Sequence, residues 1–190
     1  LKNQNNPEDL NSIYGKLLYR LTKSKTIDHV KALFWFQGEA DSDESWERYE
    51  KNFDKFFSSI KHDLSGLRKF YLFQTRPGCD GEHQSELRNV QRNLSTKYQD
   101  IGIISTTGIE YHDGCHYYLN GYYELAEQLF LRLGGDLYGE TKLKINEPPD
   151  IKEIRYTDKN LKSLQLIFDQ PLKKLPENEL TEIKNYFYSN

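Results

Sequence analysis

The tetrapeptide Asp113-Gly-Cys-His116 places two residue types that can perform hydrolytic chemistry at a short spacing. An Asp three residues before a His, on a tight turn at the start of a helix, can set its carboxylate against the imidazole. The other ring nitrogen is then free to take a proton as a general base. Asp113 and His116 could therefore be part of a hydrolytic triad, which would also need a nucleophile and an oxyanion site.

Alternating apolar patterns predict the elements that must position this loop. Short apolar runs predict buried strands at Val30–Phe36, Lys69–Thr75 and Ile101–Thr106. Helical spacing predicts helices over residues 7–22, 45–64, 82–98 and 119–133. Strands that alternate with helices indicate a doubly wound α/β fold with a parallel sheet, in which ligands bind beyond the carboxyl ends of the strands. We therefore expect the loops after Phe36, Thr75 and Thr106 to share one edge.

A change of pattern after Leu133 predicts a second segment. The stretch GGDLYGE is typical of a turn-rich link, and two strands are predicted around the turn Asp158-Lys159-Asn160. The terminal PENELTEIKNYFYSN fits a short helix or an unfinished part of a β-rich domain. We expect residues 1–138 to form the α/β domain and residues 139–190 a linker with the start of a small β-rich accessory domain.

The composition excludes some classes of partner. The net charge is −3, the pI is about 6.0, and no basic stripe recurs along a predicted face, which argues against a nucleic acid partner. A mean hydropathy of −0.84 and the absence of a long apolar run argue against a membrane span. The N-terminus carries no signal-peptide pattern, so it does not indicate a location.

The two cysteines, Cys79 and Cys115, fall in loops that we expect on the same edge of the sheet. One bridge is compatible with this placement, but the low count favours two free thiols. A zinc site is an alternative function for this edge, since Cys and His are zinc ligands. Its spacing matches no standard zinc motif, and we expect no metal and no cofactor. The residues that would form it are Cys79, His83, His112, Asp113, Cys115 and His116.

A second motif, WFQGEAD, ends the first predicted strand at residues 35–41. A strand ending in Phe-Gln, a helix bearing ELRNVQ and the DGCH loop before the last helix follow in order. Over about residues 10 to 135 the chain resembles the SGNH hydrolase superfamily, in particular its sialate O-acetylesterase-like carbohydrate esterases. The resemblance implies a three-layer, flavodoxin-like α/β fold, incomplete at its N-terminus, that removes acetyl groups from a sugar through an acyl-enzyme.

The resemblance also implies roles for particular residues. His116 is expected to be the base and Asp113 the residue that orients it, while Gln37 and Gly38 lie at the position that helps form the oxyanion hole. A fixed amide such as the Gln37 side chain can stabilise an oxyanion by roughly 3 kcal/mol.

Other polar residues at this edge are expected to support the site. Glu39 cannot donate when ionised, so we expect it to fix the neighbouring backbone or a side chain such as Arg76. Arg76 and His83 could contact substrate hydroxyls or a carboxylate. Arg88 and Gln91 match the helix pattern of the family without an assigned role.

The nucleophile departs from the family pattern. The Gly-Gln-Ser or Gly-Asp-Ser turn of the family lies far upstream of QGE, whereas only 36 residues precede Gln37 here. Ser42 is expected to cap the following helix and Ser105 to have a buried or turn role. We therefore expect the nucleophilic serine on an upstream segment or a separate chain, so that this chain alone would be inactive.

The expected partners follow from this assignment. The substrate would be an acetylated carbohydrate, with Tyr117 and Tyr118 available to stack on sugar rings. By resemblance the protein would be secreted or periplasmic. A non-catalytic carbohydrate-binding or scaffold relative of the same fold is the alternative, and the residue at the upstream nucleophile position would discriminate the two.

Overall fold

The structure is a computed structural model that describes residues 2–43, 45–79, 81–140 and 149–171. The chain divides into two compact units, Leu1–Glu147 and Pro148–Asn190. The first unit contains both motifs found in the sequence. The domain limits expected at residues 138 and 139 stay a prediction.

Parallel strands form the sheet of the first unit. They are β1 (Ala32–Phe36), β2 (Lys69–Phe73) and β3 (Ile101–Ile104), in the spatial order β1-β2-β3. Phe36 pairs with Phe73, and Phe73 with Ile104, so the strands end level with one another. The predicted parallel sheet is confirmed, with each strand two residues shorter at one end. Thr75 leaves the sheet because its N–H donates to a side chain, Gln91 Oε1, at 2.9 Å.

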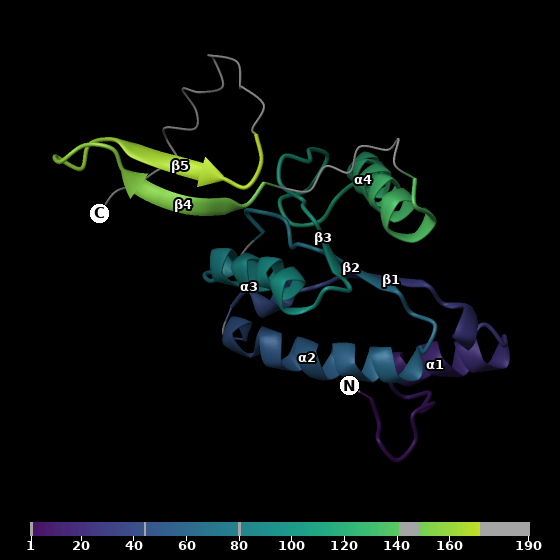
Figure 1. The fold of residues 1–190 in the computed structure, drawn as a ribbon. Helices are drawn as coiled ribbons and strands as arrows, with labels where there is room; N and C mark the ends of the chain where they lie inside the picture. Colours follow the sequence, from purple (N-terminus) through teal and green to yellow (C-terminus); the bar gives the residue numbers. More distant parts are fainter. Residues whose placement is uncertain (1, 44, 80, 141–148, 172–190) are drawn as a thin grey trace. The chain divides into compact units, whose positions relative to one another are not determined.

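Helices cover both faces of the sheet. Figure 1 shows α1 (Ile13–Lys23), α2 (Trp46–Asp63) and α3 (Gln84–Lys97) on one face and α4 (Leu119–Tyr138) on the other. Successive side chains of a strand point to opposite faces. Phe70 and Leu72 of β2 accordingly belong to the core shared with α1, α2 and α3, and Tyr71 and Phe73 to the core shared with α4. The predicted three-layer α/β architecture is confirmed.

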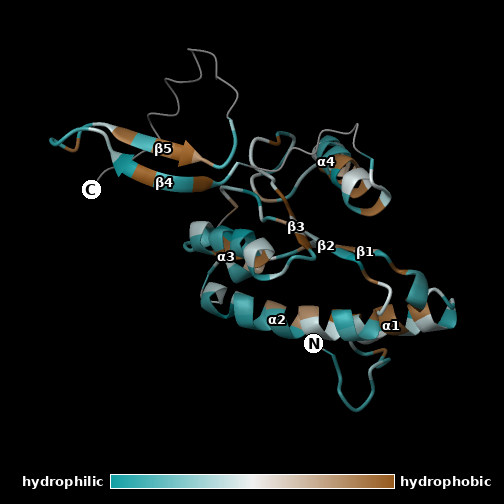
Figure 2. Ribbon diagram, viewed as in Figure 1, coloured by the Kyte–Doolittle hydropathy of each residue, from teal (hydrophilic) through white to brown (hydrophobic). Residues whose placement is uncertain are grey.

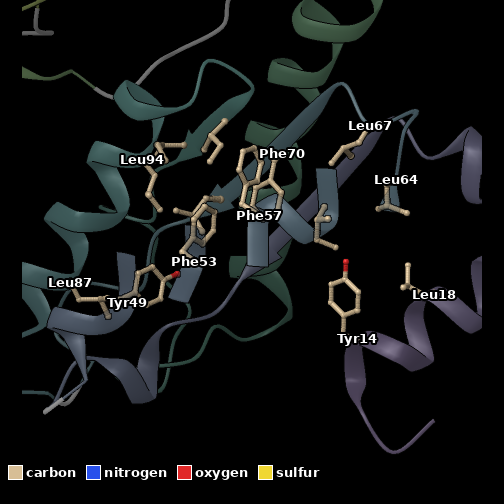
Figure 3. Packing of buried hydrophobic residues seen from close by; sticks show 14 residues of the cluster. Tyr14, Leu18, Tyr49, Phe53, Phe57, Leu64, Leu67, Phe70, Leu87 and Leu94 are labelled. Atoms are coloured by element: carbon tan, nitrogen blue, oxygen red, sulfur yellow. The ribbon is translucent and has the colours of Figure 1, made fainter. Parts of the chain in front are cut away.

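Aromatic rings fill the larger of these cores. Phe53 and Phe57 of α2 meet Phe70 of β2 edge to face, with ring centroids 5.5 and 5.4 Å apart (Figure 3). This is a preferred geometry for aromatic pairs, and each ring buries a large area. Figure 2 shows how the hydrophobic residues are distributed along the chain. β3 is coloured as hydrophobic, whereas α2 is largely hydrophilic and its hydrophobic residues recur at intervals. A chain with few aliphatic residues thus builds its core from aromatic ones.

The first helix begins later than its apolar pattern predicts. Ser12 is its N-cap, because the Ser12 hydroxyl oxygen accepts from the N–H of Gly15 at 2.9 Å. The expected start at Pro7 is therefore wrong, and residues 7–12 form turns that lead into the cap.

The last helix of the first unit ends later than predicted. It continues through Gly134 and Gly135, which were expected in a turn-rich link, and ends at Tyr138, with Gly139 as its C-cap at φ 67°. Asp136 explains the continuation, since its carboxylate accepts from Tyr71 Oη of β2 and from Arg132 Nε, each at 3.0 Å. These contacts hold the final turns against the sheet despite the low helix propensity of glycine.

The second unit contains the predicted hairpin. Strands β4 (Ile151–Tyr156) and β5 (Leu164–Phe168) pair antiparallel. Asp158 initiates the turn, since its Oδ1 accepts from the N–H groups of Asn160 at 2.8 Å and Lys162 at 3.2 Å. The expectation for the terminal segment PENELTEIKNYFYSN lies outside the described residues.

Candidate active site

Loops that follow the strands carry the candidate residues. Residues 37–45 follow β1, residues 74–83 follow β2 and residues 105–118 follow β3. Because the strands are parallel and end level, these loops lie at one edge of the sheet. The middle loop contacts both of its neighbours: the N–H of His83 donates to the carbonyl oxygen of Ser42 at 2.9 Å, and Arg76 contacts residues 112 and 114.

Hydrogen bonds join the two ends of the DGCH loop. An antiparallel bridge joins His112 to Tyr117, and the N–H of Asp113 donates to the carbonyl oxygen of His116 at 3.0 Å. Gly114 stands at φ 118°, a backbone conformation that a side chain would strain. A tight turn therefore presents Asp113 and His116 at the edge of the sheet.

Asp113 contacts both the backbone of this turn and the imidazole. Its Oδ1 accepts from the N–H groups of Cys115 at 2.9 Å and His116 at 2.7 Å. These backbone donors, Cys115 first, lower the pKa of the Asp113 carboxyl, and the nearby His116 ring adds to the effect. Its Oδ2 lies 3.7 Å from His116 Nδ1, an ion-pair distance that is longer than a hydrogen bond. Asp113 is thus held ionised on the Nδ1 side of the ring.

His116 is open to solvent, with its side chain 66% exposed. Its Nε2 has no hydrogen-bond partner in the part of the chain that the structure describes. With the carboxylate on the Nδ1 side, Nε2 is the nitrogen that can accept a proton from another group. The imidazole is therefore oriented as a general base requires, with Nδ1 toward the carboxylate and Nε2 toward solvent.

The turn after β1 holds Gln37 and Gly38. Gln37 Nε2 donates to Asp41 Oδ2 at 2.5 Å, and Asp41 Oδ1 accepts from Ser45 Oγ at 3.1 Å. One proton of the Gln37 amide is thus committed to Asp41. Gly38 is buried at φ 141°, and a Cβ there would lie 2.8 Å from Gln91 Nε2. This close approach explains why glycine stands at this position.

Asp41 was not singled out by the sequence analysis. It lies four residues after Gln37, and the intervening 3-10 helix η2 (Glu39–Asp41) returns the chain so that the two side chains meet. The signal was present in WFQGEAD as a second carboxylate at a one-turn spacing from Gln37.

Arg76 has a different partner from the one expected. We expected Glu39 to fix Arg76 or the neighbouring backbone. Instead, Arg76 Nη1 donates to the carbonyl oxygen of Gly114, and Nη2 lies 2.8 Å from His112 Nε2. The pairing of Glu39 with Arg76 is therefore wrong, because the DGCH turn lies closer to the guanidinium. Arg76 positions that turn.

A disulfide joins Cys79 to Cys115, with Cα atoms 4.1 Å apart, so the expectation of two free thiols is wrong. The residue count could not show this, because the pairing depends on how close the loops after β2 and β3 come. The bond also removes two thiolates from the alternative zinc site. Over the described ranges, the structure gathers no group of three or more His, Cys, Asp or Glu side chains for a metal ion.

The supporting helix residues reach the strand ends from α3. Arg88 donates to the carbonyl oxygen of Thr75, to Thr106 Oγ1 at 3.1 Å and to Thr107 Oγ1 at 2.9 Å. Gln91, three residues later, is fully buried beside Thr75. Both side chains therefore form hydrogen bonds with the loops that follow the strands.

Ser42 and Ser105, the two serines considered in the sequence, both have structural roles. Ser42 is 1% exposed, and its Oγ donates to the carbonyl oxygen of Glu39 at 2.8 Å. The expected cap on α2 is therefore wrong, since Ser45 is the residue at that position. Ser105 Oγ accepts from the N–H of Thr107 at 3.3 Å, in a turn.

Tyr117 is buried and its hydroxyl donates to the carbonyl oxygen of Thr106 at 2.9 Å, so it packs in the core and cannot stack on a sugar. Tyr118, by contrast, is 58% exposed. Among the described residues, no helix has the length and apolarity to cross a membrane.

Comparison with known proteins agrees with this arrangement. A family model described as carbohydrate esterase, sialic acid-specific acetylesterase, matches residues 2–133. Comparisons with curated proteins and with solved structures found no match. The matched region is more than half of the chain and contains the QGE turn, the α3 residues and the DGCH loop. The chain therefore belongs to the carbohydrate esterase family of sialic acid-specific acetylesterases.

Proposed function

We propose that this chain is the base-bearing part of a serine esterase that removes O-acetyl groups from a sugar. The observation that carries the proposal is the Asp113–His116 pair, with an ionised carboxylate on the Nδ1 side of an exposed imidazole. Family membership supports the esterase chemistry. The serine nucleophile is proposed to come from an upstream segment or a separate chain.

The proposed reaction proceeds through an acetyl-enzyme. The serine oxygen attacks the acetyl carbonyl carbon while His116 Nε2 takes the serine proton, and the carbonyl oxygen becomes an oxyanion. The tetrahedral intermediate collapses, the sugar oxygen leaves, and His116 gives it the proton. Water then attacks the acetyl-serine with His116 again as base, and acetate is released.

Oxyanion stabilisation is assigned to the turn after β1. The Gln37 amide has a second N–H that does not bond Asp41, and the carboxylate of Asp41 fixes the orientation of this amide. A donor fixed before the reaction stabilises the developing charge without reorganisation, typically by about 3 kcal/mol. Gly38 contributes backbone at the same position.

The open edge of β1 supports completion of the sheet by another segment. No strand pairs with the outer edge of β1 among the described residues, and Phe34 is 51% exposed although parallel sheets are normally buried on both faces. A pocket of about 600 Å³ lies beside this edge. It is lined by Ile13, Tyr14, Leu17, Leu33, Phe34, Trp35, Gln37, Asp41, Tyr49, Asn52, Phe53 and Phe56. A strand added here would end beside Gln37.

The proposed location is outside the cytoplasm, either secreted or periplasmic. The Cys79–Cys115 disulfide supports it, since such bonds form and persist mainly in oxidising compartments. The proposed partner is an acetylated carbohydrate, and the exposed Tyr118 ring is available for stacking on a sugar.

The test measures hydrolysis of a chromogenic acetyl ester and of an O-acetylated sugar by a polypeptide that includes the upstream segment. His116→Ala should lower kcat by about 1,000-fold or more, and Asp113→Asn by at least about 100-fold. His29→Ala replaces an exposed histidine before β1 and should leave the rate unchanged.

A His116→Ala variant with nearly the full rate would refute the assignment. Ester hydrolysis by the present 190 residues alone would refute the upstream nucleophile. Binding of the acetylated sugar with no turnover would instead favour the non-catalytic relative.

A further inference from the structure

One polar side chain is completely buried beside the turn after β1 and takes no part in the proposed proton transfers. Gln91 of α3 is 0% exposed, although its amide carries donors and an acceptor. An amide buried without partners is strongly unfavourable, so its partners show what the residue holds in place.

The hydrogen bonds of Gln91 join the ends of two strands. Its Oε1 accepts from the N–H of Thr75 at 2.9 Å and from the Thr75 hydroxyl at 3.4 Å. Its Nε2 donates to the carbonyl oxygen of Gln37 at 3.1 Å and to Tyr49 Oη at 3.3 Å. Tyr49 Oη also donates to the Gln37 carbonyl oxygen at 3.3 Å. Gln91 thereby ties the turn after β1 to the end of β2.

A tyrosine is ordinarily protonated at neutral pH, and at Tyr49 burial favours the protonated form further. Burial raises the pKa of Tyr49 to about 12, although the bond from Gln91 acts in the opposite direction. The hydroxyl therefore stays protonated at neutral pH and can donate to the Gln37 carbonyl oxygen.

Packing restrains the same turn. The α-carbon of Gly38 rests against Gln91, and an added Cβ would lie 2.8 Å from Gln91 Nε2 and 3.0 Å from Thr75 Cγ2. The carbonyl of Gln37 is thus held by hydrogen bonds, and the next residue is held by contact. Removing the Gln91 amide is therefore expected to shift the backbone of residues 37 and 38.

Arg88 extends this arrangement to the third strand end. It lies one helical turn before Gln91 on the same face of α3. Its guanidinium reaches the carbonyl oxygen of Thr75 and the hydroxyls of Thr106 and Thr107. The inward face of α3 therefore contacts the chain after β1, β2 and β3.

We propose that Gln91 is a positioning residue of this esterase, which holds the Gln37 carbonyl and the Gly38 backbone so that the donors of this turn face the oxyanion. The inference rests on the proposed function, because the position of the turn matters for rate only if the turn stabilises an oxyanion. Gln91 acts through the turn and does not touch the reacting atoms.

The test uses Gln91→Met, which keeps the shape and volume of the side chain and removes its hydrogen bonds. In the polypeptide that includes the upstream segment, kcat should fall by about 10- to 100-fold while KM changes by less than about threefold, as expected for a misplaced transition-state contact. Asn93→Met makes a comparable change on the exposed side of α3 and should leave kcat unchanged.

A second measurement does not depend on catalysis. In the 190-residue chain, Gln91→Met should shift the backbone amide resonances of Gly38 and Thr75 and leave those of Cys115 and His116 in place. Tyr49→Phe removes one hydroxyl, keeps the ring in the core and should shift the Gly38 resonance less. If Gln91→Met does not fold, Gln91→Asn decides the question, because it keeps the amide but shortens the side chain by one methylene and should shift the same two resonances.

An unmoved Gly38 resonance in a folded variant, or an unchanged kcat, would overturn the proposal. A rise in KM with constant kcat would also overturn it, since it would place Gln91 in substrate binding. If the wild-type polypeptide hydrolyses no acetyl ester, the proposed function fails, and with it the role in rate. The Gly38 resonance would then still report whether Gln91 positions the turn.

Discussion

Asp113 shows how one carboxylate can serve two structural tasks at once. One oxygen binds the backbone of its own turn and the other faces the imidazole of His116. The first task is the Asx turn that is common at helix starts. The contact with the imidazole requires that the chain reverse direction, so that the His116 ring lies near Asp113. The antiparallel bridge between His112 and Tyr117 closes this reversal.

The pH dependence of this turn follows from the direction of the pKa shift. The pKa of Asp113 is lowered from its ordinary value of 3.8, so the folded turn binds the ionised form more strongly than the unfolded chain does. The stabilisation is complete above the unfolded pKa of 3.8 and is lost as the pH falls through the lower, folded pKa. Amide resonances of Cys115 and His116 should titrate with a midpoint below 3.8.

Asp113→Asn is the control for this titration. Asparagine keeps an acceptor oxygen for the same N–H groups but does not ionise, so the amide resonances should stay constant across the acid range. A midpoint at or above 3.8 in the wild-type chain would contradict the assignment of the shift to the backbone donors.

At the scale of elements, the loop after β2 is the common support of the candidate site. It contacts the loop after β1 through His83 and Ser42, and the loop after β3 through Arg76 and the disulfide. Gln84 at the start of α3 closes this loop, since its amide donates to the carbonyl oxygen of Arg76 at 2.7 Å and accepts from the N–H of Gly78 at 2.6 Å. The candidate base and the proposed oxyanion turn are thereby linked through a third segment.

The disulfide should stabilise the whole first unit. Its partners are 36 residues apart, for which the chain-entropy argument gives about 3 to 4 kcal/mol. The double variant Cys79→Ser, Cys115→Ser should therefore lower the thermal midpoint by about 10 °C and increase hydrogen exchange at residues 112–117. Calorimetry and exchange measured with and without a thiol reductant provide the check.

The reductant supplies the matched control for that variant. It should lower the midpoint of the wild-type chain to the value of the double variant and leave the variant unchanged. Equal midpoints for oxidised and reduced wild-type chains would show that the bond adds no stability.

At the scale of the molecule, β2 and β3 of the described sheet are covered on both faces, whereas β1 is open at its outer edge. Every residue of β3 is buried, whereas β1 contains no buried residue. An apolar edge strand without a partner is a site for pairing with another segment. We therefore expect the outer edge of β1 to be the place where the proposed upstream segment pairs with the sheet.

A charge at the open edge should separate completion from folding. Phe34→Lys should leave the circular dichroism of the present chain unchanged, because Phe34 is 51% exposed, and should prevent recovery of esterase activity when the upstream segment is supplied separately. Phe130→Lys is the matched control, since Phe130 of α4 is 66% exposed and does not line the pocket beside β1. Equal recovery with both variants would place the upstream segment elsewhere.

Apolar periodicity is a local property of the chain, so the order and type of the helices and strands could be predicted from the sequence. The sequence also indicated the candidate base, its orienting acid and the proposed oxyanion donor, since QGE and DGCH each lie within a few consecutive residues. The ends of two helices differ from those predicted. The Ser12 cap and the Asp136 contact with Tyr71 moved two helix ends, because side chains from elsewhere decide where a helix stops.

Contacts between segments that are far apart in the chain could be identified only in the folded molecule. The Cys79–Cys115 bond, the Arg76 contact with Gly114 and the buried Gln91 between Gln37 and Thr75 each join residues separated by 16 or more positions. No local pattern encodes such contacts, because they depend on the register of the strands and on how the loops bend. The candidate catalytic residues could therefore be named from the sequence, whereas the residues that contact and position them could be named only from the fold.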